Sequence, residues 1–250
     1  SLIGGDESVP ALTQALNSPD TFTVACYALE RIPAPAAEQA LLQALASADA
    51  AHKVALINAL GAKHSAAAVA ALEPLIADAD ANIAQAAIAA LGGIPAQEAA
   101  LALAKAKAAA PANLQPALGM ALLSAADRLR QAGDTKTAAG ILTTLYAPTE
   151  PKGVRLAALK ELVTLLDAKG SSLVLDVLSG SEAEFQAVAI ECVPEIPGTA
   201  ATQELAARLP ELTPAVQPVL VSALARRGDK AALPAVTAAV SAADEAVRMS

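Results

Sequence analysis

The 250-residue chain has no tryptophan, and aromatic residues make up only 2% of it. Compact single cores are usually filled with large side chains, so this scarcity argues against one central core. Alanine is abundant instead, and hydrophobic residues together reach 55%. Small side chains let helix axes approach to roughly 8 Å, and alanine has the highest helix propensity. The composition therefore predicts many closely packed helices.

Other absences exclude classes of protein. The net charge of −8 argues against a nucleic-acid partner, whose phosphate backbone needs a basic face. The sequence has no sustained alternation of β-branched residues, which is the pattern that predicts a strand. The chain has only two cysteines, so a disulfide framework is not indicated and the compartment (periplasmic, secreted or cytoplasmic) stays open. The longest charge-free run, residues 108–126, holds prolines and polar side chains, which favours a turn and a buried helix over a membrane span.

The chain repeats itself with a period of about 31 residues, which is typical of repeat proteins. Similar segments such as Ala59-Leu60-Gly61 and Ala90-Leu91-Gly92 recur, and we call the residue eight before each central leucine the anchor. The anchors are Thr21, His52, Ile83, Leu114, Val154, Phe185, Val216 and Val247. They are evenly spaced except between Leu114 and Val154, where the step is longer. The sequence thus contains eight repeats in one register, with an insertion near 124–134.

Each repeat predicts two helices. Apolar residues stand four and eight positions after the anchors, on one face of a second helix. Pairs such as Leu41/Leu45 and Leu72/Ile76 predict a first helix before it, and Asp or Ser between the two can cap the second. Because one hairpin cannot bury its own apolar face, we expect an all-α fold: an α-α superhelix (α-solenoid) of about eight stacked hairpins, forming a single domain over 1–250.

The segments "GVRLAALKEL" (153–162) and "DEAVR" (244–248) resemble the second-helix motif of HEAT repeats. The short period resembles the bacterial HEAT form related to phycobilin lyases. This resemblance implies the fold and says little about function. It also implies a ladder of Arg–Asp pairs between repeats, but the position after the anchor is arginine only at Arg155 and Arg248. We therefore expect apolar packing to hold the repeats together.

The ends of the chain lack the polar caps that a solenoid needs. Residues 1–5 resemble the tail of a missing repeat, so we expect a fragment of a longer chain. Segments such as "ALERIP" also resemble HEAT regions of large planctomycete- or verrucomicrobium-type proteins, which often adjoin a carbohydrate-active or haem domain.

Residues typical of catalysis or cofactor binding are scarce. His52 and His64 have no cysteine or carboxylate at ligand spacing, which argues against a metal site. Cys26 falls in an apolar column and Cys192 in a column of small residues, and both are predicted to be buried, unreactive thiols. The pair Gly92-Gly93 is interpreted as a helix C-cap, not a phosphate-binding loop. The sequence predicts no catalytic residue and no cofactor.

The remaining candidates lie on the surface. The column six after the anchor faces away from the apolar face, and it supplies the candidate partner-binding residues Tyr27, Asn58, Met120, Lys160, Glu191 and Ser222. The alternative is an ordinary solvated helix face. The insertion is a second candidate: we expect it to lengthen one second helix by about two turns, as a ridge carrying Arg128 and Arg130. These arginines, like Arg226, Arg227 and Lys230, are otherwise interpreted as solvated helix ends.

The favoured hypothesis is a non-catalytic scaffold that binds a protein partner or an adjacent domain of the same chain. One alternative is an accessory HEAT arm of a multidomain secreted enzyme, carbohydrate-active or haem-containing. A third hypothesis is a bilin-lyase-like enzyme, which rests on the resemblance of the short repeat.

Overall fold

The computed structural model describes residues 5–240, and throughout this range the regular structure is helical. Packing divides the chain into two compact units, residues 1–141 and 142–250. The prediction of one domain over 1–250 stays a prediction.

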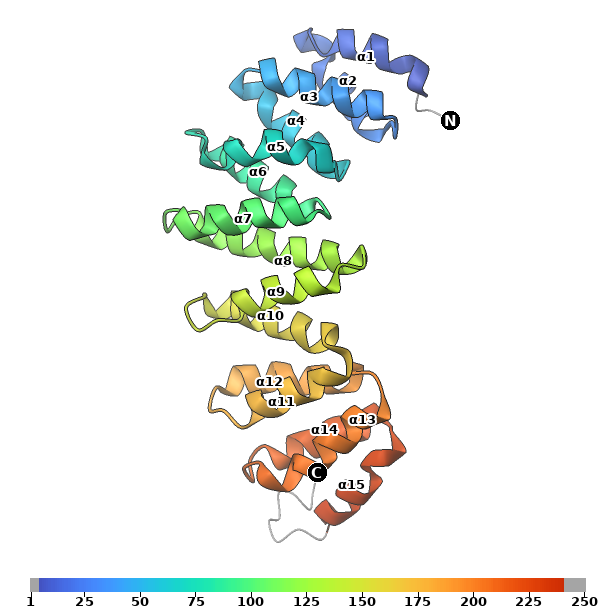
Figure 1. Cartoon of the computed structure of the whole chain (residues 1–250), viewed down its shortest axis with the longest axis vertical. Helices are drawn as coiled ribbons and strands as arrows, with labels where there is room; N and C mark the ends of the chain where they lie inside the picture. The colour runs from blue at the N-terminus through green and yellow to red at the C-terminus, as the bar shows by residue number, and fades with distance from the viewer. Residues whose placement is uncertain (1–4, 241–250) are drawn as a thin grey trace. The chain divides into compact units, whose positions relative to one another are not determined.

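Unit 1 consists of helical hairpins stacked in two layers (Figure 1). The first helices are α1 (Val9–Ala15, after η1 Asp6–Ser8), α3 (Pro35–Ser47), α5 (Val69–Leu72, between η2 Ala66–Ala68 and η3 Glu73–Ala77) and α7 (Gln97–Ala109). The second helices are α2 (Pro19–Arg31), α4 (Ala50–Ala62), α6 (Ala81–Gly93) and α8 (Gln115–Gln131). Each second helix contacts the next, α2 to α4 to α6 to α8. Helix α9 (Thr135–Leu145) crosses the boundary between the units.

Unit 2 has the same construction, and each of its first helices is preceded or followed by a short 3-10 segment. Its second helices are α10 (Lys152–Leu165), α12 (Ala183–Cys192, followed by η5 Val193–Glu195) and α14 (Gln217–Arg227). Its first helices are α11 (Gly170–Leu178, after η4 Asp167–Lys169), α13 (Thr199–Arg208, before η6 Leu209–Glu211) and α15 (Leu233–Val240, after η7 Lys230–Ala232). Helices α10, α12 and α14 contact in succession, as α11 and α13 do.

These hairpins confirm the predicted all-α, HEAT-like helical repeat. Within the described residues, both predicted apolar columns of the second helices are buried. Four after the anchors these are Ala25, Leu56, Ala87, Leu118, Ala158, Ala189 and Leu220; eight after, they are Leu29, Leu60, Leu91, Leu122, Leu162, Val193 and Leu224. Two of the predicted caps form: Asp49 accepts from the His52 backbone N–H, and Asp80 accepts from that of Asn82. The eighth anchor, Val247, and Arg248 lie outside the described residues.

The interpretation of Gly92-Gly93 as a C-cap is wrong. Gly92 lies inside α6 and has no left-handed backbone. Its role is to let two helices approach, because a Cβ atom on Gly92 would lie 2.8 Å from the carbonyl oxygen of Ala121 on α8. One repeat earlier, a Cβ on Gly61 would lie 2.8 Å from the Cβ of Ala90. Neighbouring second helices thus touch backbone to backbone at equivalent positions.

Apolar packing joins the repeats through the buried columns of contacting second helices, and basic side chains link the repeats as well. Arg227, eleven after its anchor, donates to the backbone oxygens of Val193 at 2.8 Å and Gly198 at 2.7 Å. Its Nε donates to Thr202 Oγ1 at 2.6 Å, and the Thr202 hydroxyl donates to Asp229 Oδ2 at 2.8 Å. Arg227 is therefore not the solvated helix end that its sequence context predicted.

Lys63 occupies the same repeat position as Arg227, in unit 1. Its Nζ donates to the backbone oxygens of Leu29, Glu30 and Ile32, so it satisfies the C-terminus of the preceding second helix. Burial lowers the pKa of this ammonium group below 10.5. Two residues on, Ser65 donates to Glu38 Oε1 at 2.6 Å, which matches the Thr202–Asp229 link in position.

The position after the anchor, where the HEAT resemblance implies an arginine, is glutamine in three repeats. Gln115, Gln186 and Gln217 each donate through Nε2 to backbone oxygens where their own first helix ends. Only Arg155, among the described residues of this column, pairs with a carboxylate of the next repeat, Glu182 at 3.2 Å. The glutamines stabilise the hairpin turn, while Arg155 joins two hairpins.

We predict that Gly92→Ala destabilises the chain by about 1–3 kcal/mol, because the new methyl group meets the backbone of Ala121. Gly140→Ala is the control, since a Cβ there meets nothing within 4 Å and alanine favours a helix by about 1 kcal/mol. Urea unfolding measures both. A Gly92→Ala variant as stable as the control would contradict the close approach.

A second prediction concerns the Arg227–Thr202–Asp229 link. Thr202 is fully buried, and Thr202→Val keeps the shape of the side chain but removes its hydroxyl group. Because Arg227 and Asp229 each lose a hydrogen-bond partner, we expect the variant to be destabilised by about 1–3 kcal/mol. Hydrogen bonds, first from the Ala231 N–H and next from Thr202, hold the pKa of Asp229 below 3.8. The stabilisation from this carboxylate is present at neutral pH and is lost as the pH falls below that value. Thr237→Val, at an exposed helical site, is the control, and an equal effect of both substitutions would contradict the link.

Candidate functional site

The predicted surface column is exposed in unit 1. Tyr27 on α2 is 57% exposed and Met120 on α8 is 62% exposed. Asn58 on α4 and Ala89 on α6 are exposed at the equivalent positions. Because α2, α4, α6 and α8 contact in order, these side chains form one row across unit 1.

This row is almost free of charge. Helix α6 carries no ionisable residue, and α4 carries only His52 and Lys53. Val24, one turn before Tyr27, is 70% exposed. Arg31 lies beside the row, where its Nη1 donates to the Tyr27 hydroxyl at 2.9 Å and its guanidinium lies 5.1 Å from the Tyr27 ring centroid. We call Val24, Tyr27, Asn58, Ala89 and Met120 the unit 1 band.

The same column in unit 2 is exposed but charged. It consists of Lys160 on α10, Glu191 on α12 and Ser222 on α14. Val219, on α14, is 48% exposed near this row. The predicted column therefore comprises two chemically different surfaces, one in each unit. Its role in binding stays a prediction.

The insertion does not form the expected two-turn ridge. Helix α8 has 17 residues where α2, α4 and α6 have 13, which adds about one turn. The added turn packs inward through Ala125, Ala126 and Leu129, all buried. Arg128 is half-buried, and Arg130 is exposed and pairs with Asp127 in the same helix. A part in binding for these two arginines stays a prediction.

The histidines and cysteines have structural surroundings. His52 is one-third exposed, its Nδ1 lies 2.8 Å from Asp49 Oδ1, and its ring lies 4.1 Å from that of Phe22. His64 is exposed, with Nδ1 2.7 Å from the backbone oxygen of Gly93. Cys26 and Cys192 are buried, as predicted, and burial raises the pKa of each thiol to about 11.

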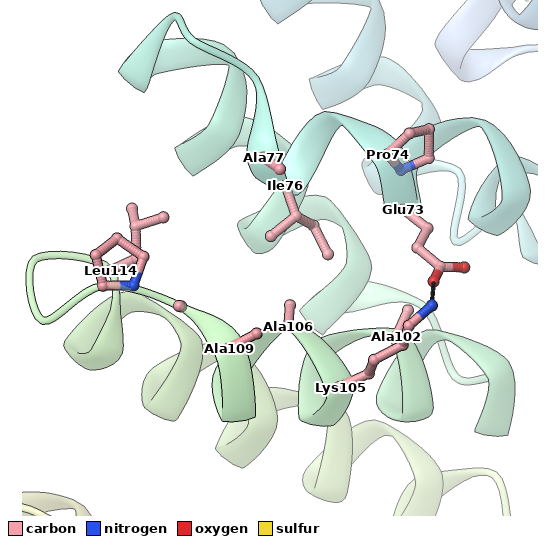
Figure 2. A pocket seen from close by; sticks show the side chains of 11 residues that line it. Glu73, Pro74, Ile76, Ala77, Ala102, Lys105, Ala106, Ala109 and Leu114 are labelled. Carbon is pink, nitrogen blue, oxygen red and sulfur yellow. Dashed lines mark hydrogen bonds and ion pairs between the residues drawn. The ribbon is translucent and has the colours of Figure 1, made fainter.

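Sequence reasoning missed a hollow between η3 and α7 (Figure 2). It has a volume of about 390 Å³, and Ile76 and Ala77 on one side face Ala102, Ala106 and Ala109 of α7 on the other. Leu114 lies at one end of the hollow. At the other end, Lys105 Nζ forms an ion pair with Glu73 Oε1 at 3.0 Å. The sequence signal is the run of alanines on α7, which by itself indicates only helix propensity.

The described part of the chain contains neither a metal-binding cluster nor a membrane span. Residues 5–240 bring together no three His, Cys, Asp or Glu side chains that could hold a metal ion. No helix in that range is both long and apolar enough to cross a bilayer.

The chain is similar to several solved structures. No model of a protein family matches the chain, and no curated protein matches it. The chain is similar to human deoxyhypusine hydroxylase in complex with glycerol, at 20% identity over 97% of this chain and 93% of that one, with a TM-score of 0.44. It is also similar to the complex of CpcE and CpcF of phycocyanin lyase from Nostoc sp. PCC7120, at 20% identity over 92% of each chain, with a TM-score of 0.44. A designed armadillo repeat protein matches at 18% identity over 96% and 95%, with a TM-score of 0.30.

We predict that neither thiol reacts with a thiol-specific reagent at pH 8 while the chain is folded. A pKa of about 11 leaves few thiolate anions, and burial blocks access. The chain unfolded in urea should react with two equivalents of the reagent, one for each cysteine, and this reaction is the control. Rapid modification of either cysteine in the native chain would contradict this prediction.

Proposed function

We propose that the chain is a non-catalytic scaffold that binds a protein partner through the unit 1 band. The observation that carries the proposal is the exposure of Val24, Tyr27 and Met120, at 70%, 57% and 62%, on a face where large apolar side chains have no packing role in the repeat. Exposed apolar patches are typical of interaction sites. Tyrosine and methionine are enriched at such interfaces.

The chemistry of the band defines the class of partner. The exposed positions of α4 and α6 present small or uncharged side chains, such as Asn58 and Ala89. A partner that buries charge against them would lose hydration without gaining an opposite charge. We therefore infer an extended or helical segment with an apolar, uncharged contact face, seated across α2, α4, α6 and α8.

The rigidity of the band supports this role. Its side chains stand on helices that are fixed by fully buried columns such as Leu29, Leu60 and Leu91. A partner then meets a preorganised surface and loses less conformational entropy on binding. The repeat fixes the spacing of the contacts, and the residue at each exposed position decides the specificity.

We expect peptides selected by display against the intact chain to be apolar and uncharged at their contact positions. Tyr27→Ala and Met120→Ala should each weaken their binding about fivefold or more, the loss of roughly 1 kcal/mol or more that marks important interface residues. Leu101→Ala is the matched control, because Leu101 is 60% exposed but stands on a first helix. Fluorescence anisotropy gives the Kd values.

The salt dependence is a second measurement on the same complex. Because the unit 1 band has little charge, the Kd should change less than about twofold between about 0.05 and 0.5 M salt. Strong weakening by salt, or selected peptides that bind the Tyr27→Ala and Met120→Ala variants as well as the original chain, would assign binding to another surface, such as the charged row of unit 2.

A further inference from the structure

The hollow between η3 and α7 has a counterpart two repeats earlier. A second hollow, of about 340 Å³, lies between the turn after α1 and the α3–α4 hairpin. Five of its lining residues precede five lining residues of the first hollow by two full periods of the sequence repeat. The pairs are Ala44 with Ala106, Ser47 with Ala109, Ala48 with Ala110, Asp49 with Pro111 and His52 with Leu114.

One position that lines both hollows carries a small side chain. It is eight residues before the anchor, and both hollows have alanine there, at Ala44 and Ala106. The repeat between them has Leu75, which is half-buried. A leucine side chain is thus accommodated at this position in unit 1, and Ala44 and Ala106 are each smaller than leucine by three carbon atoms.

The two hollows differ in polarity. The earlier one has the hydroxyl of Ser47, the carboxylate of Asp49 and the imidazole of His52. At the equivalent positions the η3–α7 hollow has Ala109, Pro111 and Leu114. Its only charged lining groups are Lys105 and Glu73, which pair with each other at 3.0 Å at one end, as Figure 2 shows. The pair adds no net charge to the site.

We propose that the η3–α7 hollow binds a small, neutral and mostly apolar molecule with one hydrogen-bonding group. The volume of about 390 Å³ lies within the range of ligand sites. At roughly 30 Å³ for each displaced water, it suits a molecule of up to about thirteen non-hydrogen atoms. The apolar part of the ligand lies between Ile76 and Ala106. Its polar group reaches the Lys105–Glu73 pair, which offers both a donor and an acceptor.

The ligand is neutral for an electrostatic reason. An anion that binds Lys105 would lie close to the Glu73 carboxylate, and a cation that binds Glu73 would lie close to the Lys105 ammonium group. Either one would leave one charge beside another of the same sign. A hydroxyl group can donate to Glu73 or accept from Lys105 without breaking the pair. The site therefore discriminates against ionised analogues of the same length.

The test uses the intact chain and 1-octanol as the probe, with octanoate and octylammonium as charged analogues. Methyl NMR spectra report on Ile76 and Leu114 in the η3–α7 hollow and on Leu16 and Leu56 in the earlier hollow. We expect octanol to shift the first two signals saturably and to leave the other two unchanged. Both charged analogues should bind at least fivefold more weakly.

Two variants of α7 then locate the site. Ala106→Leu gives position 106 the leucine that the preceding repeat has at position 75. It should weaken octanol binding at least tenfold, while Tm stays the same or rises by a few degrees. Ala104→Leu is the matched control, because Ala104 is exposed on the same helix and does not line the hollow. Ala106→Val, a smaller filling, should give an intermediate loss.

Several outcomes would overturn the proposal. They are octanol binding that Ala106→Leu leaves intact, equal loss in the Ala104→Leu control, equal binding of octanoate, and no saturable shift at Ile76 or Leu114. None of these measurements involves the unit 1 band. The scaffold proposal and the ligand proposal can therefore fail separately.

Discussion

The structure depends on direct contact between successive second helices. Helices α2, α4, α6 and α8 in unit 1, and α10, α12 and α14 in unit 2, bury one another's apolar columns. A single hairpin has too little apolar surface to fold by itself, so the neighbour supplies the other half of each core. The contact is closest where Gly61 meets Ala90 and Gly92 meets Ala121. The alanine-rich composition is the result, because larger residues would push the helices apart.

Polar groups reinforce the same register. The cations Lys63 and Arg227 stand at one repeat position and both satisfy the carbonyl groups at the end of the preceding second helix. The pairs Ser65–Glu38 and Thr202–Asp229 likewise match each other in position. Such links are directional, whereas apolar contact is not, so they favour one alignment of neighbouring hairpins over a slipped one. At Lys63 and Arg227, the polar links therefore add a specific alignment to the stability that apolar packing supplies.

The sequence predicted the features that a periodic pattern carries. The repeat register, the buried columns, the capping by Asp49 and Asp80 and the exposure of Tyr27 and Met120 all follow from helical spacing. The links of Arg227 and Lys63 were missed because a long side chain can reach water or a neighbouring backbone from the same place in the sequence. The errors have the same kind of cause. Only tertiary packing shows how closely α8 approaches Gly92. The sequence likewise does not show whether the Cβ atom of an alanine faces a neighbour or an empty space.

The hollow at α7 also has a consequence for how repeat proteins of this kind evolve. Its boundary is drawn from parts of two adjacent repeats, the end of one first helix and the body of the next. Duplication or loss of a whole repeat at this junction would separate the two walls and pair each with a new neighbour. A single-residue exchange at position 106 alters the space without moving any helix. Recognition in this chain can therefore diversify either by shuffling repeats or by point substitution, and the two routes leave different traces in sequence.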